Sequence, residues 1–154
     1  MSKLSGRNRR RGAALVEFAL ILPILLLLFL GIIEFGVVMM HQLTLVQVAR
    51  EGSRHASLGK PVAQIEERIY NTAGALPNHT DLTIQMNYST DQGLTYPYVL
   101  GDNLGGENDA PPGSLIKVTL TWPHHLITGS FFSWLTGVQG DVLPLKSEVV
   151  MRRE

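Results

Sequence analysis

A run of 28 residues from Ala13 to Met40 contains only two charged side chains, Glu17 and Glu34. Between these two acids, the segment 18–33 has no polar side chain. As a helix, the run would extend about 42 Å, whereas about 20 apolar residues suffice to cross a bilayer. A surface helix of a soluble domain would carry a polar stripe, which this run lacks. The sequence therefore predicts a single transmembrane helix over residues 13–40.

The charges are divided between a basic leader and an acidic remainder. Residues 1–12 contain five Lys and Arg and no acid. The rest of the chain has eight Lys and Arg against 13 Asp and Glu, a net charge of −5. The positive-inside rule places the N-terminus in the cytoplasm and the C-terminal domain in the periplasm or outside the cell. An acidic body of this kind also gives no indication of nucleic-acid binding.

Two other classes of protein fit the sequence poorly. A cleaved signal peptide would explain the basic start, but its apolar region is usually about 7–15 residues long and ends at a small-x-small site. No such site follows this longer run. The chain has no cysteine, no Gly-x-Ser-x-Gly motif and no Walker A loop. These absences give an enzyme no support, and they exclude disulfides and thiolate metal sites.

Glu17 lies five residues inside the apolar run, between Val16 and Phe18. A carboxylate in hydrocarbon is costly and is usually paired or functional. Either Glu17 reaches the membrane interface, or it pairs with a cation, which the run does not supply before His41. Glu34 lies about 25 Å farther along a helix, so we expect it to be a solvated residue at the outer interface.

Three ordered segments resemble one known family. Residues 10–23 combine a basic leader, Gly12, a small apolar stretch, Glu17-Phe18 and a helix that contains Pro23. Residues 31–36 and 48–56 follow in order, and the latter contain Ala-Arg-Glu-Gly-Ser-Arg, with Ser53 in place of a usual Ala. Together they resemble the TadE-like family, which are pseudopilins of the tight-adherence (Flp pilus) secretion machinery.

The resemblance implies a processing site and a function. Family members are cut after the Gly by a membrane prepilin peptidase, which here implies cleavage between Gly12 and Ala13. Glu17 would then be the fifth mature residue, and with Phe18 it would serve assembly and recognition. Without cleavage, Gly12 would simply mark the N-terminal end of a helix.

The implied protein is a minor pseudopilin of a Flp type IV pilus, anchored by one helix in the inner (cytoplasmic) membrane. It would need no cofactor or metal. The implied partners are prepilin peptidase, other pilins and pseudopilins, the pilus platform membrane proteins, the pilus ATPase and membrane lipid. The alternative is a signal-anchored exported binding domain that is not incorporated in a pilus.

The membrane helix is expected to continue as an amphipathic helix. Leu43, Val46 and Ala49 recur at helical spacing, and the segment 58–61, Leu-Gly-Lys-Pro, should end the helix. Pro61 suits the first position of a second helix that ends near residues 71–74. Its apolar face would consist of Val62, Ile65 and Ile69.

Alternating apolar and polar residues predict strands at 82–88, 116–122 and 143–151, the last one at a sheet edge because of Pro144. Helices followed by strands indicate an α+β fold, here a small antiparallel sheet packed on the long helix, as in pilins. The expected organisation is a leader (1–12), a transmembrane helix (13–40), a helix extension (41–58) and an exported α+β domain (59–154).

Three segments of the domain remain to be interpreted. Residues 89–113 are rich in Gly, Asn, Asp and Pro, and their acids do not have EF-hand spacing, so a solvated loop is favoured over a calcium site. His124 and His125 are adjacent in a strand, so they should point to opposite faces and not share a metal. The apolar segment 126–138 is either a short helix over the sheet or a contact patch for another pilus component.

Overall fold

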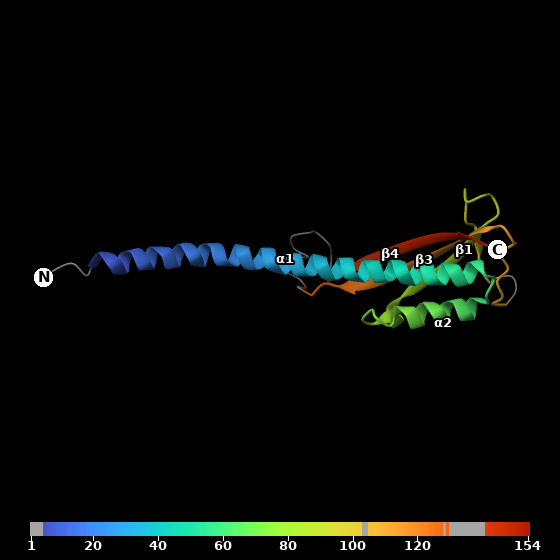
Figure 1. Ribbon diagram of the computed structural model, residues 1–154, viewed down its shortest axis with the longest axis horizontal. Coiled ribbons are helices and arrows are strands. Elements are labelled where there is room, and N and C mark those ends of the chain that lie inside the picture. The colour runs from blue at the N-terminus through green and yellow to red at the C-terminus, as the bar shows by residue number, and fades with distance from the viewer. Residues whose placement is uncertain (1–4, 103–104, 128, 130–140) are drawn as a thin grey trace. The chain divides into compact units, whose positions relative to one another are not determined.

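The computed structural model describes residues 5–102, 105–127, 129 and 141–154 (Figure 1). The chain divides into two compact units, Met1–Val37 and Val38–Glu154. Helix α1 (Ser5–Ser57) begins in the first unit and ends in the second. It starts eight residues before Ala13, so part of the basic leader is helical.

The first unit presents an apolar helix surface. Of the described residues, one helix is long and apolar enough to cross a membrane, the segment Gly12–Ser57. Its large apolar side chains are exposed on every side of α1, as the row from Leu15, Val16 and Phe18 to Ile33 and Phe35 illustrates. This helix is consistent with single-pass anchoring.

Glu34 does not behave as predicted. Only 7% of its surface is exposed, so the expectation of a solvated boundary residue is wrong. That expectation used only the distance along the helix, which takes no account of how side chains pack around a position.

The second unit is an α+β domain with one antiparallel sheet. After α1, the chain forms α2 (Val62–Ala73), a 3-10 turn η1 (His79–Asp81) and four strands. The strands are β1 (Thr83–Ser89), β2 (Tyr98–Val99), β3 (Leu115–His125) and β4 (Val142–Arg152), in the order β2-β1-β3-β4. Figure 1 shows α2 beside the C-terminal part of α1, and both helices lie along the sheet.

The alternating pattern of the strands is confirmed by their burial. In β3, Ile116, Val118, Leu120 and Trp122 are all buried, and Leu82, Met86 and Tyr88 are buried in and beside β1. The register pairs Met86 with Val118 and Trp122 with Leu145. Pro144 is exposed on β4, which is an edge strand, as predicted. The two-residue strand β2 was not predicted, since it is too short to show alternation.

The face that α1 buries differs from the predicted one. Leu43 is 61% exposed and Val46 is only partly buried, so of the predicted stripe only Ala49 is fully buried. The true stripe recurs at spacings of three and four and consists of His41, Leu45, Val48, Ala49, Gly52, Ser53, Ala56 and Ser57. Several of these are small or polar, so a search for large apolar residues places the stripe wrongly. Small residues let the helix lie close to its neighbours.

The two helix boundaries follow from local chemistry. Gly59 follows α1 with a φ of +73°, a conformation that glycine adopts without steric cost, and its backbone N–H donates to the Ala56 carbonyl at 3.0 Å. Pro61 is the N-cap of α2 and not its first helical residue, so the predicted start is one residue early. The predicted end of α2 near residues 71–74 is confirmed.

Residues 89–113 are not simply the solvated loop that was predicted. Tyr98 and Val99 pair with β1 as β2, and part of the segment is buried: Leu100, Asn108 and Ala110. A loop that buries such residues has a structural role in the domain.

This role is to cap two helices. The Asn108 side-chain N–H donates to the Ala56 carbonyl at the end of α1 at 2.8 Å. The Val62 backbone N–H, at the start of α2, donates to the Gly106 carbonyl at 2.8 Å. Helix ends leave such groups without intrahelical partners, so the loop stabilises both helices.

Candidate functional site

The four residues predicted to serve processing and assembly lie on the exposed surface of α1. Gly12, Ala13, Glu17 and Phe18 are all exposed, and 60% of the Phe18 surface is accessible. Ala13 and Glu17 are four residues apart, so they lie on one face of the helix, about one turn from each other. The structure therefore brings these two positions together.

Gly12 has no packing role among the residues that the structure describes. Because α1 begins at Ser5, Gly12 does not mark the N-terminal end of the helix, and that interpretation is wrong. A Cβ atom added at Gly12 would meet nothing within 4 Å. Glycine inside a helix costs about 1 kcal/mol relative to alanine. The described residues include no contact that would require glycine at this position and so explain this cost.

Glu17 lies among exposed apolar side chains. Leu20 and Ile21, three and four residues later, have 71% and 60% of their surfaces exposed. These positions neighbour Glu17 on the helix surface, together with Ala13 one turn earlier. A single carboxylate in an apolar surface differs from all its neighbours, so a cationic group on another molecule could recognise it.

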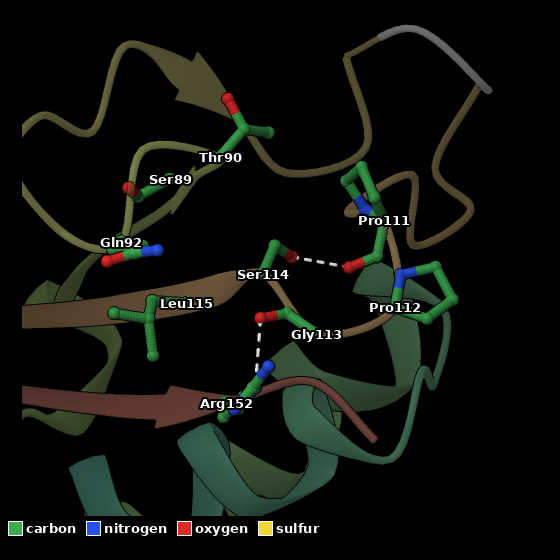
Figure 2. A pocket seen from close by; sticks show the side chains of 9 residues that line it. All are labelled: Ser89, Thr90, Gln92, Pro111, Pro112, Gly113, Ser114, Leu115 and Arg152. Atoms are coloured by element: carbon green, nitrogen blue, oxygen red, sulfur yellow. Dashed lines mark hydrogen bonds between the residues drawn. The ribbon is translucent and has the colours of Figure 1, made fainter.

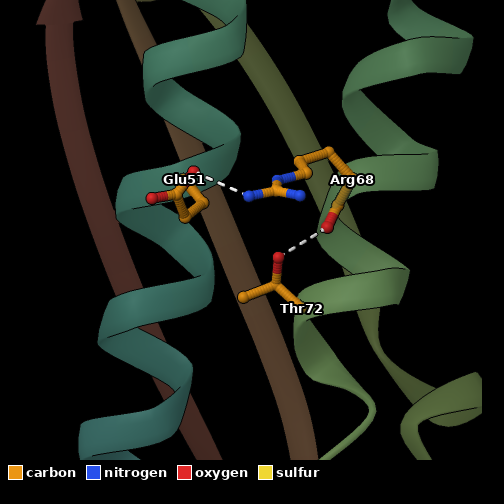
Figure 3. A network of polar contacts seen from close by, with 3 residues as sticks. All are labelled: Glu51, Arg68 and Thr72. Carbon is orange, nitrogen blue, oxygen red and sulfur yellow. Dashed lines mark hydrogen bonds and ion pairs between the residues drawn. The ribbon is translucent and has the colours of Figure 1, made fainter.

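The segment 48–54 of α1 has a different role, because its side chains and backbone pack against α2. Figure 3 shows Arg68 of α2 pointing toward Glu51, with 3.6 Å between the guanidinium and carboxylate atoms. The Thr72 hydroxyl donates to the Arg68 carbonyl at 2.8 Å within α2. Both charged side chains are partly exposed, so this ion pair orients the helices more than it stabilises them.

Gly52 and Ser53 allow close packing in the same segment. A Cβ atom at Gly52 would lie 2.7 Å from two side-chain atoms of Ile69 on α2. Ser53 is fully buried, and its hydroxyl donates to the Val149 carbonyl of β4 at 3.3 Å. The Ala-Arg-Glu-Gly-Ser-Arg segment is therefore architectural in this domain.

A small pocket of about 240 Å³ lies beside the start of β3 and the end of β4 (Figure 2). Arg152 Nε donates to the Gly113 carbonyl at 3.1 Å, and the Ser114 hydroxyl donates to the Pro111 carbonyl at 2.6 Å. These polar groups bond to the pocket's own backbone, so they fix the turn and do not form a catalytic arrangement.

Asp91 organises the loop next to this pocket. Its carboxylate accepts hydrogen bonds from the Ser89 hydroxyl and from the hydroxyl and backbone N–H of Thr95. These donors hold the pKa of Asp91 well below its ordinary value. Such a carboxylate stays ionised and acts as a structural acceptor.

No metal centre is found in the part of the chain that the structure describes, since no group of three or more His, Asp or Glu side chains could hold an ion there. Asp109, one of the acids in the 89–113 loop, accepts the Gly101 backbone N–H at 2.7 Å. His124 is buried and His125 is exposed, so the two point to opposite faces, as predicted. The apolar segment 126–138 lies largely outside the described residues.

Sequence reasoning missed a contact between His41 of α1 and His124 of β3. Their Nδ1 atoms are 3.1 Å apart, although 83 residues separate them in the chain. No pattern in the sequence indicated this contact, because the buried stripe that contains His41 and Leu45 was itself predicted on another face of α1.

Comparison with known proteins gives one result for the helical segment. Residues 12–54, which run from Gly12 along α1 to Arg54, match the family model described as TadE-like protein. Searches of curated proteins and of solved structures find no match. TadE-like proteins belong to Tad pilus systems, in which they are structural components. Over residues 12–54, the chain is thus similar to the TadE-like family.

Proposed function

We propose that this chain is a minor pseudopilin of a Flp (tight-adherence) type IV pilus. It is held by α1 in the inner membrane as a single-pass protein, with its N-terminus in the cytoplasm and its C-terminal domain exported. Prepilin peptidase cleaves it between Gly12 and Ala13. The mature chain then associates with other pilins and pseudopilins and with the platform membrane proteins.

One observation carries the proposal. Gly12 is a costly residue within a helix, has no contact that requires it, and lies five residues before an exposed acid in an apolar surface. A residue without a Cβ atom lets another molecule approach the backbone closely. An external partner would explain this glycine, and a peptidase that approaches the backbone closely meets that need.

Cleavage would change the charge of the helix terminus. Hydrolysis of the Gly12–Ala13 peptide bond removes all five leader cations and creates an α-amino group on Ala13. This amine has an ordinary pKa of about 7.7–8.0, so much of it is cationic at neutral pH. In an assembled bundle, the carboxylate of Glu17 pairs with the Ala13 amine of a neighbouring subunit, and each ion compensates the other in apolar surroundings.

The family match over residues 12–54 and the exposed apolar surface support this arrangement. The surface of α1 from Leu15 to Phe35 consists largely of exposed apolar side chains. These side chains need lipid or other helices to cover them. Lipid satisfies this need before assembly, and neighbouring pilin helices satisfy it afterwards. Phe18, next to Glu17, would pack against such a neighbour.

Assembly provides the test. A Glu17→Gln variant keeps the shape of the side chain and removes its charge, so we expect it to accumulate in the membrane but to be depleted from the sheared pilus fraction and from crosslinked complexes with the major pilin. Glu67→Gln, at an exposed acid of α2, is the matched control and should assemble normally. Normal assembly of Glu17→Gln would count against the ion pair.

The absence of the wild-type chain from every crosslinked pilus complex would count against the pseudopilin itself. It would favour the signal-anchored binding domain. The two results are distinguishable, because the first concerns a variant and the second concerns the unmodified protein.

A further inference from the structure

The part of α1 that packs in the domain has an outer ridge, on the side of the helix opposite its buried stripe. The ridge consists of five exposed residues that recur at spacings of three and four: Met40, Leu43, Gln47, Arg50 and Arg54. This spacing places them in one row along the helix surface. Leu43 was predicted to be buried, so part of the apolar pattern that misled the prediction lies on this ridge.

The first half of the outer ridge is apolar. Met40 and Leu43 are 55% and 61% exposed, and Met39 beside them is 45% exposed. These residues belong to the second compact unit, which begins at Val38. Apolar side chains that adjoin one another on an exposed face indicate a contact with another molecule.

The second half of the outer ridge carries two arginines. Arg50 and Arg54 are one helical turn apart on the same face, so their like charges repel each other. Three other arginines of the domain bind a carboxylate or a carbonyl of the chain itself, namely Arg68, Arg152 and Arg153. Among the residues that the structure describes, the guanidinium groups of Arg50 and Arg54 have no such partner. They are the outward-facing residues of the Ala-Arg-Glu-Gly-Ser-Arg segment, whose other side packs in the domain.

We propose that the outer ridge binds an acidic helix of another protein. Two carboxylates, three or four residues apart on that helix, pair with Arg50 and Arg54, and apolar residues on the same face cover Met40 and Leu43. A guanidinium binds a carboxylate through two parallel hydrogen bonds, and the bound anions also relieve the repulsion between the two arginines. The partner is a helix because the ridge is a straight row about 21 Å long, along which a second helix can pack.

The position of the arginines favours a protein over an anionic lipid. Arg50 and Arg54 follow Met40, where the predicted membrane run ends, by 10 and 14 residues. These separations correspond to about 15 and 21 Å along a helix, whereas the headgroup region on each side of a bilayer is about 5–8 Å thick. A headgroup beside the end of the run therefore does not reach the two arginines.

This surface is separate from the positions that the proposed function uses. Glu17 and Phe18 belong to the first compact unit, and the outer ridge belongs to the second. Variants of the ridge should therefore leave cleavage after Gly12 unchanged. Normal cleavage without any contact at the ridge would count against the ridge alone, so the two proposals fail separately.

Photo-crosslinking of the full chain in its native membrane tests the proposal. A benzophenone amino acid replaces Gln47, which lies between the apolar and the basic half of the ridge. Mass spectrometry should map the crosslinks to one helical segment of another protein, with two acids three or four residues apart. Combining Arg50→Glu with Arg54→Glu should lower the yield by about tenfold, the loss expected when a hydrogen bond to a charged group is removed. Replacing the two acids of the partner by lysine should then restore the yield.

Lys60→Glu is the matched control, since it reverses an exposed cation beyond the end of α1, and it should leave the yield unchanged. The same photoreactive residue at Gln64, on the exposed side of α2, should not crosslink to the acidic segment. Crosslinks to lipid alone, no crosslinks, or a protein crosslink that the double reversal does not reduce would overturn the proposal. If circular dichroism shows that the double reversal does not fold, Arg50→Gln with Arg54→Gln removes both charges without adding acids and is judged in the same way.

Discussion

Helix α1 has two regions with different kinds of surface. From Gly12 to Val37 it exposes large apolar side chains, and a Cβ atom added at Gly12, where this region starts, would meet nothing within 4 Å. From Val38 to Ser57 it buries a stripe of small and polar residues, and Gly52 there is in close contact with α2 and β3. The family match spans both regions. The matched segment thus contains residues that are exposed on the helix surface and residues that pack in the chain's own fold.

The largest difference between the regions should appear when an apolar side chain is truncated. Leu120 is fully buried in β3, so Leu120→Ala should lower the free energy of unfolding of the domain by about 2–5 kcal/mol. Leu20→Ala, at a position 71% exposed, should leave it unchanged. Urea denaturation of the full chain in detergent, followed by tryptophan fluorescence, measures both values. Equal effects would contradict the division into two regions.

A smaller difference in the free energy of unfolding is expected between substitutions at two glycines. A side chain at Gly52 would overlap Ile69, so Gly52→Val should destabilise the domain by about 1–3 kcal/mol. Gly36→Val is the control, because a Cβ atom there meets nothing within 4 Å. Combining Gly52→Val with Ile69→Ala should lower the free energy of unfolding by less than the sum of the two single changes. Truncating Ile69 makes room for the larger side chain at position 52, and that side chain fills part of the space left by Ile69. Strict additivity would show that the two residues do not pack together.

The smallest effect should come from the ion pair between α1 and α2. Glu51 and Arg68 are partly exposed, so Glu51→Gln should change the free energy of unfolding by less than about 1 kcal/mol. The difference should shrink further at high salt, which screens exposed charges. A double-mutant cycle with Arg68→Gln measures the pair, and a coupling well above 1 kcal/mol would mean that it is more buried in solution than in this structure.

The sequence predicts those parts of the fold in which the size and polarity of each side chain match its burial. The apolar run and the strands β1, β3 and β4 are of this kind, because burial imposes a period on large residues. The phase of the α1 stripe was wrong because Gly52, Ser53 and Ala56 are buried without being large or apolar enough to indicate it. The periodicity of apolar residues therefore reveals a buried face only where large side chains occupy that face.

Contacts between distant segments leave no such pattern. The capping of Ala56 by Asn108 depends on a side-chain amide that reaches one carbonyl 52 residues away. The contact of His41 with His124 depends on the register of a helix against a strand. Of the candidate site, the spacing of Gly12 and Glu17 was visible in the sequence, whereas the lack of any packing role for Gly12 became visible only with the structure.

The mature N-terminus tests the central claim most directly, namely that the first region of α1 serves other molecules. Intact mass of the membrane-extracted chain should show a species that begins at Ala13, and this species should be lost without prepilin peptidase or in Gly12→Val. Gly36→Val, at a second glycine without neighbours, should be cleaved normally. A chain that keeps residues 1–12 with the peptidase present would contradict the account, and Gly12 would then have neither a folding role nor a processing role.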